Sequence, residues 1–201
     1  MPAHGVMGNM HRVGAIIAGG EGRRFGADKA LAGIAGAPMI AHVARALKVD
    51  ALAVVGHAQA ASMLSAAALS DPDIAVRGPL AGLLAALEWA AGLNAEWLVT
   101  APCDVPLIPV GCSDALIDAA QRAGVDAAHA ATDDGVHALC AVWRPSLAQK
   151  LRADLARGIH LPVRELVPGA VRVHFADVEA FSNVNTQDDL ARLGARLAKR
   201  T

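Results

Sequence analysis

Apolar and polar positions alternate along the chain in blocks that predict a sheet covered by helices. Apolar runs without strict alternation, typical of strands buried on both faces, occupy 13–18, 51–56 and 96–104. Stretches with a helical spacing of apolar positions occupy 38–49, 58–69, 79–93, 113–124 and 146–158. Because strands that alternate with helices form crossover units, this order predicts a parallel sheet.

The last third of the chain departs from that alternation. Two apolar runs, 125–132 and 137–144, flank the turn residues DDG, which is a β-hairpin signal. Residues 170–176 alternate as a half-exposed strand does. The final stretch, 186–200, predicts a helix that Thr186 caps, with leucines along one face.

Residues at the predicted helix ends refine these bounds. Pro38 fits the first turn of its helix, Ser113 can serve as an N-cap and Gly124 can end the same helix. With no linker or repeat, we predict a single domain over residues 1–201, with residues 1–12 as a flexible extension. The expected fold is a three-layer α/β/α arrangement whose Rossmann-like sheet is mostly parallel, with a small antiparallel part.

Composition narrows the functional classes. Of the 201 residues, 54% are hydrophobic, which argues against disorder. The net charge of −1 argues against non-specific electrostatic binding to nucleic acid or to an anionic membrane. Neither a secretory signal nor a membrane span is predicted. Three cysteines, Cys103, Cys112 and Cys140, lack metal-ligand spacing, so we expect reduced thiols in a cytoplasmic protein.

A glycine-rich basic loop follows the first predicted strand. The segment "AGGEGRRFGADK" (18–29) supplies backbone freedom, exposed N–H groups and cations, a combination that suits phosphate. Its spacing matches neither the P-loop nor the dinucleotide-binding glycine pattern. A strand-to-helix turn with a solvated basic patch is the alternative.

The loop resembles the A-G-G-x-x-x-R-x-G-x-x-K signature of nucleotidyltransferases. Three later segments, "GPLAGLLAAL" (78–87), "PCDVPLIP" (102–109) and "FSNVNTQDDL" (181–190), follow in the order of the molybdenum cofactor guanylyltransferase family. That resemblance implies a magnesium-dependent enzyme with the fold of nucleotide-diphospho-sugar transferases. It would transfer GMP from GTP to Mo-molybdopterin and release pyrophosphate.

The resemblance also implies a donor site. Arg23 and Lys29 are the expected triphosphate contacts, whereas Arg24 could equally be a solvated surface residue. Asp104 ends an apolar strand at the carboxyl edge of the sheet and is the expected Mg²⁺ ligand, with a turn cap as the alternative. The remaining expected nucleotide-binding residues are Ala18, Gly19, Gly20, Asp71 (with Asp73 as a competitor), Gly78, Pro79 and Gly82.

The acceptor would meet other residues. Asn183 and Asn185 can donate and accept hydrogen bonds, which suits contact with a pterin or with the ligands around a metal, although an Asx-turn is the alternative. Arg164 is added by resemblance alone. Family members often carry Asn at the end of the second strand, where this chain has Gly56 and His57. We expect His137 to mark a strand entry and to have no catalytic role.

Two other hypotheses remain open at this stage. One keeps the fold and changes the substrates, to a molybdopterin cytidylyltransferase or a sugar-phosphate nucleotidyltransferase. The other is a non-catalytic nucleotide-binding or cofactor-binding protein. Expected partners are the two substrates and, transiently, molybdoenzymes or cofactor chaperones, with the chain as a monomer or weak oligomer.

Overall fold

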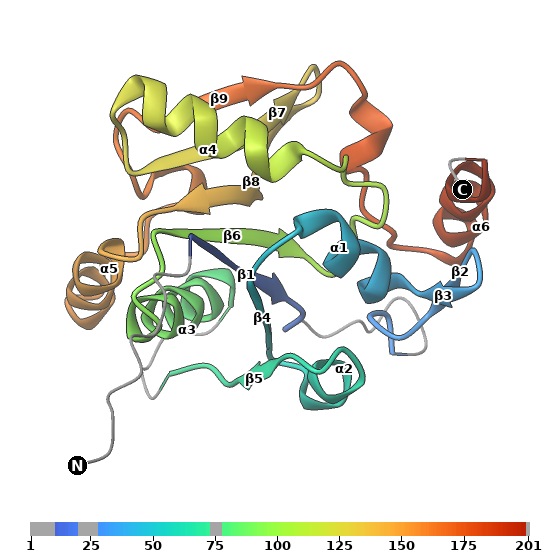
Figure 1. Cartoon of the computed structure of the whole chain (residues 1–201), viewed down its shortest axis with the longest axis horizontal. Coiled ribbons are helices and arrows are strands. Elements are labelled where there is room, and N and C mark those ends of the chain that lie inside the picture. Colours follow the sequence, from blue (N-terminus) through green and yellow to red (C-terminus); the bar gives the residue numbers. More distant parts are fainter. Residues whose placement is uncertain (1–10, 20–27, 73–77, 200–201) are drawn as a thin grey trace, which may run out of the picture.

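A twisted sheet forms the framework of the molecule. The computed structural model describes residues 11–19, 28–72 and 78–199. Within these ranges one sheet contains the strands β1 (Arg12–Ile17), β4 (Ala51–Val55), β5 (Ala67–Leu69), β6 (Trp97–Pro102), β7 (Ala127–Thr132), β8 (Gly135–Trp143) and β9 (Val171–His174). Their order is β5-β4-β1-β6-β8-β7-β9 (Figure 1). β5, β4, β1 and β6 are parallel, whereas β8 runs antiparallel to its neighbours β6 and β7, and β9 is parallel to β7.

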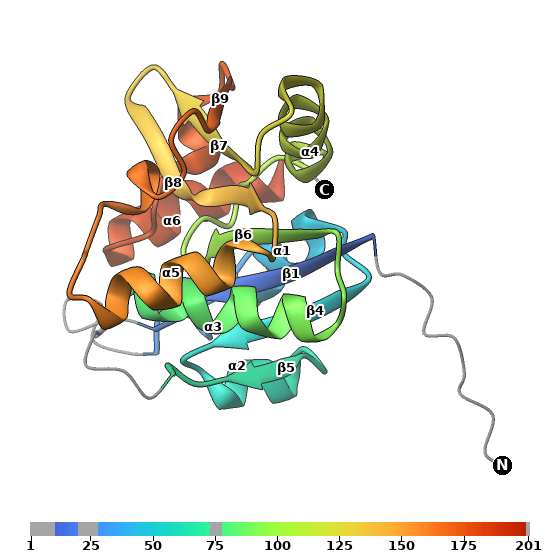
Figure 2. The same cartoon turned by 90° about the vertical axis from the view of Figure 1, so that its left-hand side faces the viewer.

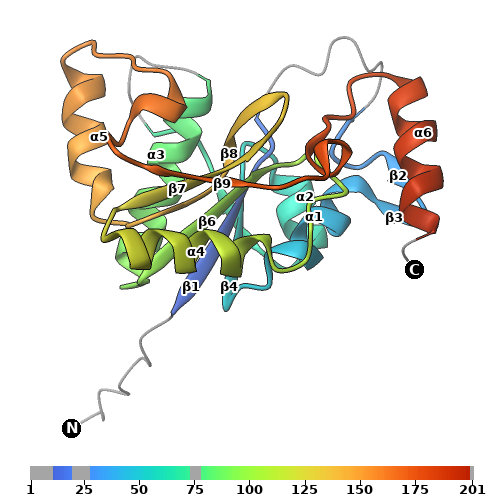
Figure 3. The same cartoon turned by 90° about the horizontal axis from the view of Figure 1, so that it is seen from above.

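Helices cover both faces of the sheet. One face carries α1 (Met39–Leu47), α2 (Ala58–Met63) and α4 (Cys112–Ala123). The other carries α3 (Pro79–Gly92) and α5 (Leu147–Ala156), which lie side by side in Figure 2. Because α3 is covered by both the sheet and α5, it is apolar around most of its circumference. Seen from above in Figure 3, α4 lies on the side of the sheet opposite α3 and α5.

A smaller unit extends the fold beside α1. Two short strands, β2 (Gly33–Ile34) and β3 (Ala37–Pro38), pair antiparallel; β3 contacts α1, and β2 contacts the C-terminal helix α6 (Gln187–Ala198). Short 3₁₀ helices, η1 (Val163–Glu165) and η2 (Val178–Phe181), complete the described elements. Thr186 and Asp189 form a capping box at the start of α6, so the predicted cap is confirmed.

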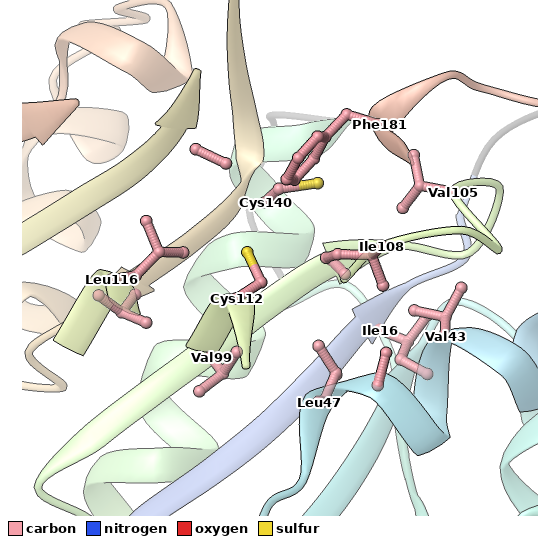
Figure 4. Packing of buried hydrophobic residues seen from close by; sticks show 14 of the residues in the cluster. Ile16, Val43, Leu47, Val99, Val105, Ile108, Cys112, Leu116, Cys140 and Phe181 are labelled. Atoms are coloured by element: carbon pink, nitrogen blue, oxygen red, sulfur yellow. The ribbon is translucent and has the colours of Figure 1, made fainter. Parts of the chain in front are cut away.

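Buried apolar side chains fill the space between the sheet and the helices. In Figure 4, Ile16 of β1 and Val99 of β6 lie in the same cluster as Leu47 of α1 and Leu116 of α4. Phe181 of η2 belongs to this cluster as well. The segment that leads toward α6 is therefore anchored in the main core.

The register of the strands determines where a ligand site can form. Ile17 at the end of β1 lies opposite Val55 of β4 and Pro102 of β6. The residues that follow these three parallel strands therefore lie level at one edge. In open α/β sheets this carboxyl edge is where ligands bind.

The predicted fold class is confirmed, and several local predictions were wrong. Residues 58–69 do not form one helix, because α2 ends at Met63 and β5 begins at Ala67. Ser113 is not the N-cap of α4; Gly111 occupies that position, and the buried Ser113 hydroxyl donates to the Leu47 carbonyl. Pro38 lies one residue before the first turn of α1, at its N-cap.

The remaining predictions agree with the structure or lie outside it. The hairpin around DDG, the half-exposed strand and Gly124 as a left-handed helix end are all present. Of the predicted extension, residues 1–10 lie outside the described residues and Arg12 begins β1. In the described ranges, no helix is long and apolar enough to cross a membrane.

Candidate functional site

A cavity of about 550 Å³ opens at the carboxyl edge of β1, β4 and β6. We call it the first cavity. Its lining comes from the ends of the three strands, the residues after them, the start of α3 and one residue of β8: Ile17, Ala18, Gly19, Asp28, Lys29, Ala30, Gly56, His57, Pro79, Pro102, Cys103, Asp104 and Leu139. The sequence-predicted residues Ala18, Gly19, Lys29, Pro79 and Asp104 are thus brought together.

An ion pair crosses the first cavity from the glycine loop to the end of β6. The Lys29 ammonium lies 2.7 Å from Asp104 Oδ2 and also donates to Asn185 Oδ1 at 2.9 Å. The Lys29 and Asp104 side chains are only 18% and 14% exposed. Three segments far apart in the sequence therefore meet at one cation.

Asp104 is held firmly and keeps one oxygen free. Its backbone carbonyl accepts a hydrogen bond from the Val184 N–H at 2.9 Å, which fixes the loop after β6 against the segment before α6. Its Oδ1 atom is buried and has no hydrogen-bond partner among the described residues. A buried carboxylate oxygen without a partner is costly, so this atom is suited to bind a ligand.

A second pair, Asp28 and His57, lines the same cavity near the end of β4. His57 Nε2 lies 2.7 and 2.9 Å from the two Asp28 oxygens, and His57 Nδ1 accepts from the Ala60 N–H as the N-cap of α2. The preceding residue, Gly56, has φ +78°, and a Cβ there would lie 2.8 Å from Gly19 Cα. A residue with a side chain at position 56 would therefore clash with the backbone of Gly19.

A second cavity of about 360 Å³ adjoins the first. Its lining comes from the loop after β6, the middle of β8 and the segment before α6: Pro102, Asp104, Val105, Val136, His137, Ala138, Leu139, Cys140 and Asn183. Asp104, Pro102 and Leu139 line both cavities. The two predicted asparagines therefore differ, because Asn183 faces the second cavity while Asn185 contacts Lys29.

Burial controls the ionisation of groups around both cavities. Burial, with the Asp104 charge as a smaller cause, raises the pKa of Cys103 to about 12, so its thiol stays protonated at neutral pH. Burial lowers the pKa of His137, whose ring stacks on Phe181 with centroids 4.8 Å apart. Neither a thiolate nucleophile nor a second fixed cation is thus supplied by these residues near pH 7.

Other predicted residues lie elsewhere or outside the described residues. Gly78 is the N-cap of α3 next to the first cavity, whereas Gly82 is buried, and a Cβ there would lie 3.4 Å from Val55 and 3.5 Å from Ile17. Packing of α3 on the sheet therefore accounts for Gly82.

Two further predicted residues lie away from both cavities. Asp71 is exposed beyond β5, and Arg164 is exposed and forms an ion pair with Glu165. Asp71 and Arg164 line neither the first nor the second cavity.

Part of the glycine loop lies outside the described residues. Gly20 and Arg23 lie outside the described residues, as do Arg24 and Asp73. Counted from Ala18, the arginine of the nucleotidyltransferase signature falls on Arg24, so the expectation that favoured Arg23 over it does not follow from that spacing. Sequence reasoning also missed Asp28 and His57 as a pair. The available signals were the position of Asp28 beside Lys29 and of His57 at a strand end.

Comparisons with known proteins identify the family. The family model of the MobA-like NTP transferase domain matches residues 14–168. A molybdenum cofactor guanylyltransferase of Cereibacter sphaeroides is 38% identical, over 94% of this chain and 99% of its own length. The chain belongs to this family. A Rhodobacter capsulatus guanylyltransferase of the same name is also 38% identical, over 94% of this chain and 97% of its own length.

Solved structures agree with this family. Molybdopterin-guanine dinucleotide biosynthesis protein A from Archaeoglobus fulgidus has a TM-score of 0.71 and 25% identity, with 94% of this chain and 99% of that chain covered. A CMP:2-keto-3-deoxy-manno-octonic acid synthetase complexed with CTP has a TM-score of 0.67 at 16% identity and covers 96% of this chain and 100% of its own; it shows the fold alone. The family resemblance and the nucleotidyltransferase class inferred from the sequence are confirmed.

Proposed function

We propose that this guanylyltransferase family member transfers GMP from GTP to Mo-molybdopterin, forming the guanine dinucleotide cofactor and pyrophosphate. The observation that carries the proposal is the contact between the two cavities at Asp104. A transferase must hold two substrates with their reacting atoms adjacent, and two cavities that share one carboxylate provide that arrangement.

The first cavity would hold the nucleotide. Gly19 supplies backbone without a side chain, and α3 begins at Pro79 beside the cavity, so the positive end of its helix dipole would favour phosphate oxygens there. Lys29 would exchange Asp104 for the triphosphate when the nucleotide binds. Arg23 and Arg24, together with Gly20, are proposed contacts in the same loop, and Gly78 and Pro79 belong to the same proposal.

The residues at Asp104 fit a magnesium ion. Mg²⁺ takes one or two carboxylates together with phosphate oxygens and water, and Asp104 Oδ1 is a buried carboxylate oxygen without a partner in the described residues. No group of three or more His, Cys, Asp or Glu side chains in those residues is arranged to hold a metal, so phosphate and water would complete the shell. When bound, the ion offsets negative charge on the phosphates.

The second cavity would hold the acceptor. Asn183 presents an amide that can donate and accept, and the stacked His137–Phe181 rings form part of its surroundings. The terminal phosphate oxygen of the acceptor would attack the α-phosphorus from that side. A new P–O bond forms, the bond from the α-phosphorus to the oxygen bridging the β-phosphate breaks, and its electron pair leaves with pyrophosphate.

No general base is required for this transfer. The attacking phosphate is already anionic, so the protein's task is to position both phosphates and to offset their charge. Lys29 and Asp104 would therefore act by charge and coordination, without moving a proton. We place the reaction in the cytoplasm, with transient contact to a molybdoenzyme or cofactor chaperone as the route for the product.

A thermal-shift panel with GTP, CTP, UTP and ATP, with and without Mg²⁺, tests the donor. A ligand at about 100 times its dissociation constant stabilises a protein that binds it only when folded by roughly 2.7 kcal/mol. We expect the largest shift with GTP and Mg²⁺, and a loss of the Mg²⁺-dependent part in Asp104→Asn. A larger shift with CTP would favour a cytidylyltransferase.

Turnover then separates an enzyme from a binding protein. With GTP, Mg²⁺ and Mo-molybdopterin, we expect pyrophosphate and the guanine dinucleotide in equal amounts. Binding of GTP without release of pyrophosphate in the presence of the acceptor would support the non-catalytic alternative. Replacement of the acceptor by a sugar phosphate is the control for the sugar-nucleotide alternative.

A further inference from the structure

The carboxylate of Asp28 needs an explanation, because it lines a cavity proposed to hold a triphosphate. A carboxylate repels phosphates, so Asp28 would weaken nucleotide binding if it faced them. Asp28 and His57 lie near the end of β4, whereas Asp104 follows β6, and β1 separates these two strands. A nucleotide bound along this edge of the sheet would therefore contact two different regions of the protein, one near β4 and one near β6.

The order of the strands indicates which end of the nucleotide would lie at which strand. The phosphates would lie toward Lys29 and Asp104, next to the second cavity where the acceptor would bind. The nucleoside would then extend across β1 toward the end of β4. Asp28 is the peptide neighbour of Lys29, so it lies beside the group that would bind the phosphates. This places it nearer to a sugar attached to the phosphates than to a base one ring further away.

The Asp28 carboxylate is held in one orientation. An amide N–H can only donate, so the Ala60 N–H requires a lone pair on His57 Nδ1. The ring proton of the neutral imidazole is therefore on Nε2, which donates to Asp28. His57 is 17% exposed and Asp28 is 43% exposed, so the imidazole is the enclosed partner and the carboxylate remains open to a ligand.

A carboxylate with one side bound and the other open accepts hydrogen bonds from hydroxyl groups. We propose that Asp28 binds the ribose hydroxyls of the nucleotide and that His57 is a positioning residue that fixes the Asp28 carboxylate. This inference rests on the proposed function, because it assumes a nucleoside triphosphate in the first cavity. It adds a specificity: the site would select ribonucleotides over deoxyribonucleotides.

Calorimetric titration without acceptor tests the inference, since no transfer then occurs. The ligands are GTP, 2′-deoxy-GTP, 3′-deoxy-GTP and ITP, with Mg²⁺. A hydrogen bond to a charged group is among the stronger ones, so we expect wild type to bind GTP ~10-fold or more tightly than at least one deoxy analogue. In Asp28→Ala we expect that ratio to fall to within about twofold, whereas the GTP to ITP ratio, which reports on the base, stays unchanged.

His57 offers a matched pair of variants. Asn is a good N-cap, so His57→Asn keeps the bond to the Ala60 N–H but lacks the ring nitrogen that reaches Asp28. We expect it to retain the wild-type melting temperature and to lose part of the ribose discrimination. His57→Ala removes both bonds, so it should lose the same discrimination and also melt earlier.

Different results would overturn different statements. Failure of wild type to bind any nucleotide would overturn the proposed function, and this inference with it. Tight GTP binding with an unchanged deoxy ratio in a folded Asp28→Ala would overturn the inference alone. So would an Asp28→Ala variant in which the GTP to ITP ratio collapses and the deoxy ratio does not, because Asp28 would then contact the base.

Discussion

The two cavities at the carboxyl edge share one carboxylate and differ in almost everything else. The first is lined by two polar pairs, Lys29 with Asp104 and Asp28 with His57, so both of its carboxylates already have partners inside the protein. Apart from Asp104, the polar side chains of the second cavity are the amide of Asn183 and the imidazole of His137, and the rest of its lining is apolar. Burial lowers the pKa of His137. One region is charged and paired, and the other is nearly neutral.

This difference indicates how each cavity would gain affinity. In the first cavity the phosphates would replace Asp104 at Lys29, whereas Asp28 would keep its bond to His57, so the site would select ligands that carry both phosphate and hydroxyl groups. The ordering cost is small because the side chains are already fixed. In the second cavity affinity would come from shape, stacking and the amide of Asn183.

Removal of the shared carboxylate should have the largest effect. Loss of one preorganised electrostatic contribution typically costs about 10²–10³ in rate, so we expect Asp104→Asn to lower GMP transfer by at least about that factor. The variant should remain folded, because the Asp104 backbone bond to Val184 is kept. Initial rates with saturating substrates measure the effect. Asp118→Asn, on an exposed face of α4, is the matched control, and a rate within threefold of wild type in Asp104→Asn would contradict the assignment.

Lys29→Met should separate two functions of one cation. Transfer should fall by roughly 10²-fold, because the charge that offsets the triphosphate is lost. Without nucleotide, however, the affinity for Mn²⁺ as a magnesium substitute should rise, because the ammonium no longer competes for Asp104. Electron paramagnetic resonance of free Mn²⁺ measures this affinity, and Lys48→Met at the exposed end of α1 is the control. Weaker Mn²⁺ binding would show that Lys29 organises Asp104 instead of blocking it.

The two asparagines before α6 test whether the cavities act separately. Asn183 lines the second cavity, so Asn183→Ala should raise the KM for the acceptor by about 10-fold and leave GTP affinity within twofold. Asn185 accepts from Lys29, so Asn185→Ala should weaken GTP binding by several-fold and change the acceptor KM less. Steady-state kinetics with calorimetry separates the two. Equal effects of both variants on both substrates would contradict the division into two cavities.

The sheet could be predicted from the sequence where the pattern of apolar residues is compatible with only one kind of element. The buried apolar runs that became β1, β4 and β6 could only be strands at the centre of a sheet, and the glycine loop and Asp104 follow from their ends. β5 was missed because Ala66, Ala67 and Ala68 fit a helix as readily as an edge strand. Pairing with β4, which local sequence does not encode, decides between them.

Site residues could be predicted from the sequence only where they belong to a recognisable motif. Lys29 and Asp104 each belong to a recognisable segment, although their direct contact spans 75 residues. The pair of Asp28 and His57 belongs to no motif, because it depends on β1 and β4 being neighbours and on α2 starting at Ala58. Asn183 and Asn185 are only two positions apart, but Asn183 lines the second cavity and Asn185 contacts Lys29. The path of the chain toward α6 determines this difference, and the local sequence does not reveal it.

The smallest expected effect concerns the neutral character of the second cavity. Burial lowers the pKa of His137 below its unfolded value near 6.5, so as pH falls through that value the unfolded chain binds a proton that the folded chain does not. The free energy of unfolding should therefore decrease below about pH 6.5, at up to about 1.4 kcal/mol per pH unit, and His137 should contribute nothing well above it.

Urea unfolding of wild type and His137→Gln at pH 7.5, 6.5 and 5.5 measures this contribution. The variant should lose less stability between pH 7.5 and 5.5 than wild type does. A part of the decline should persist, because burial lowers the pKa of His129 in the same direction. If His137→Gln showed a steeper decline, His137 would be stabilised as a cation in the folded protein. The second cavity would then carry a positive charge below pH 6.5, and the contrast with the first cavity would fail.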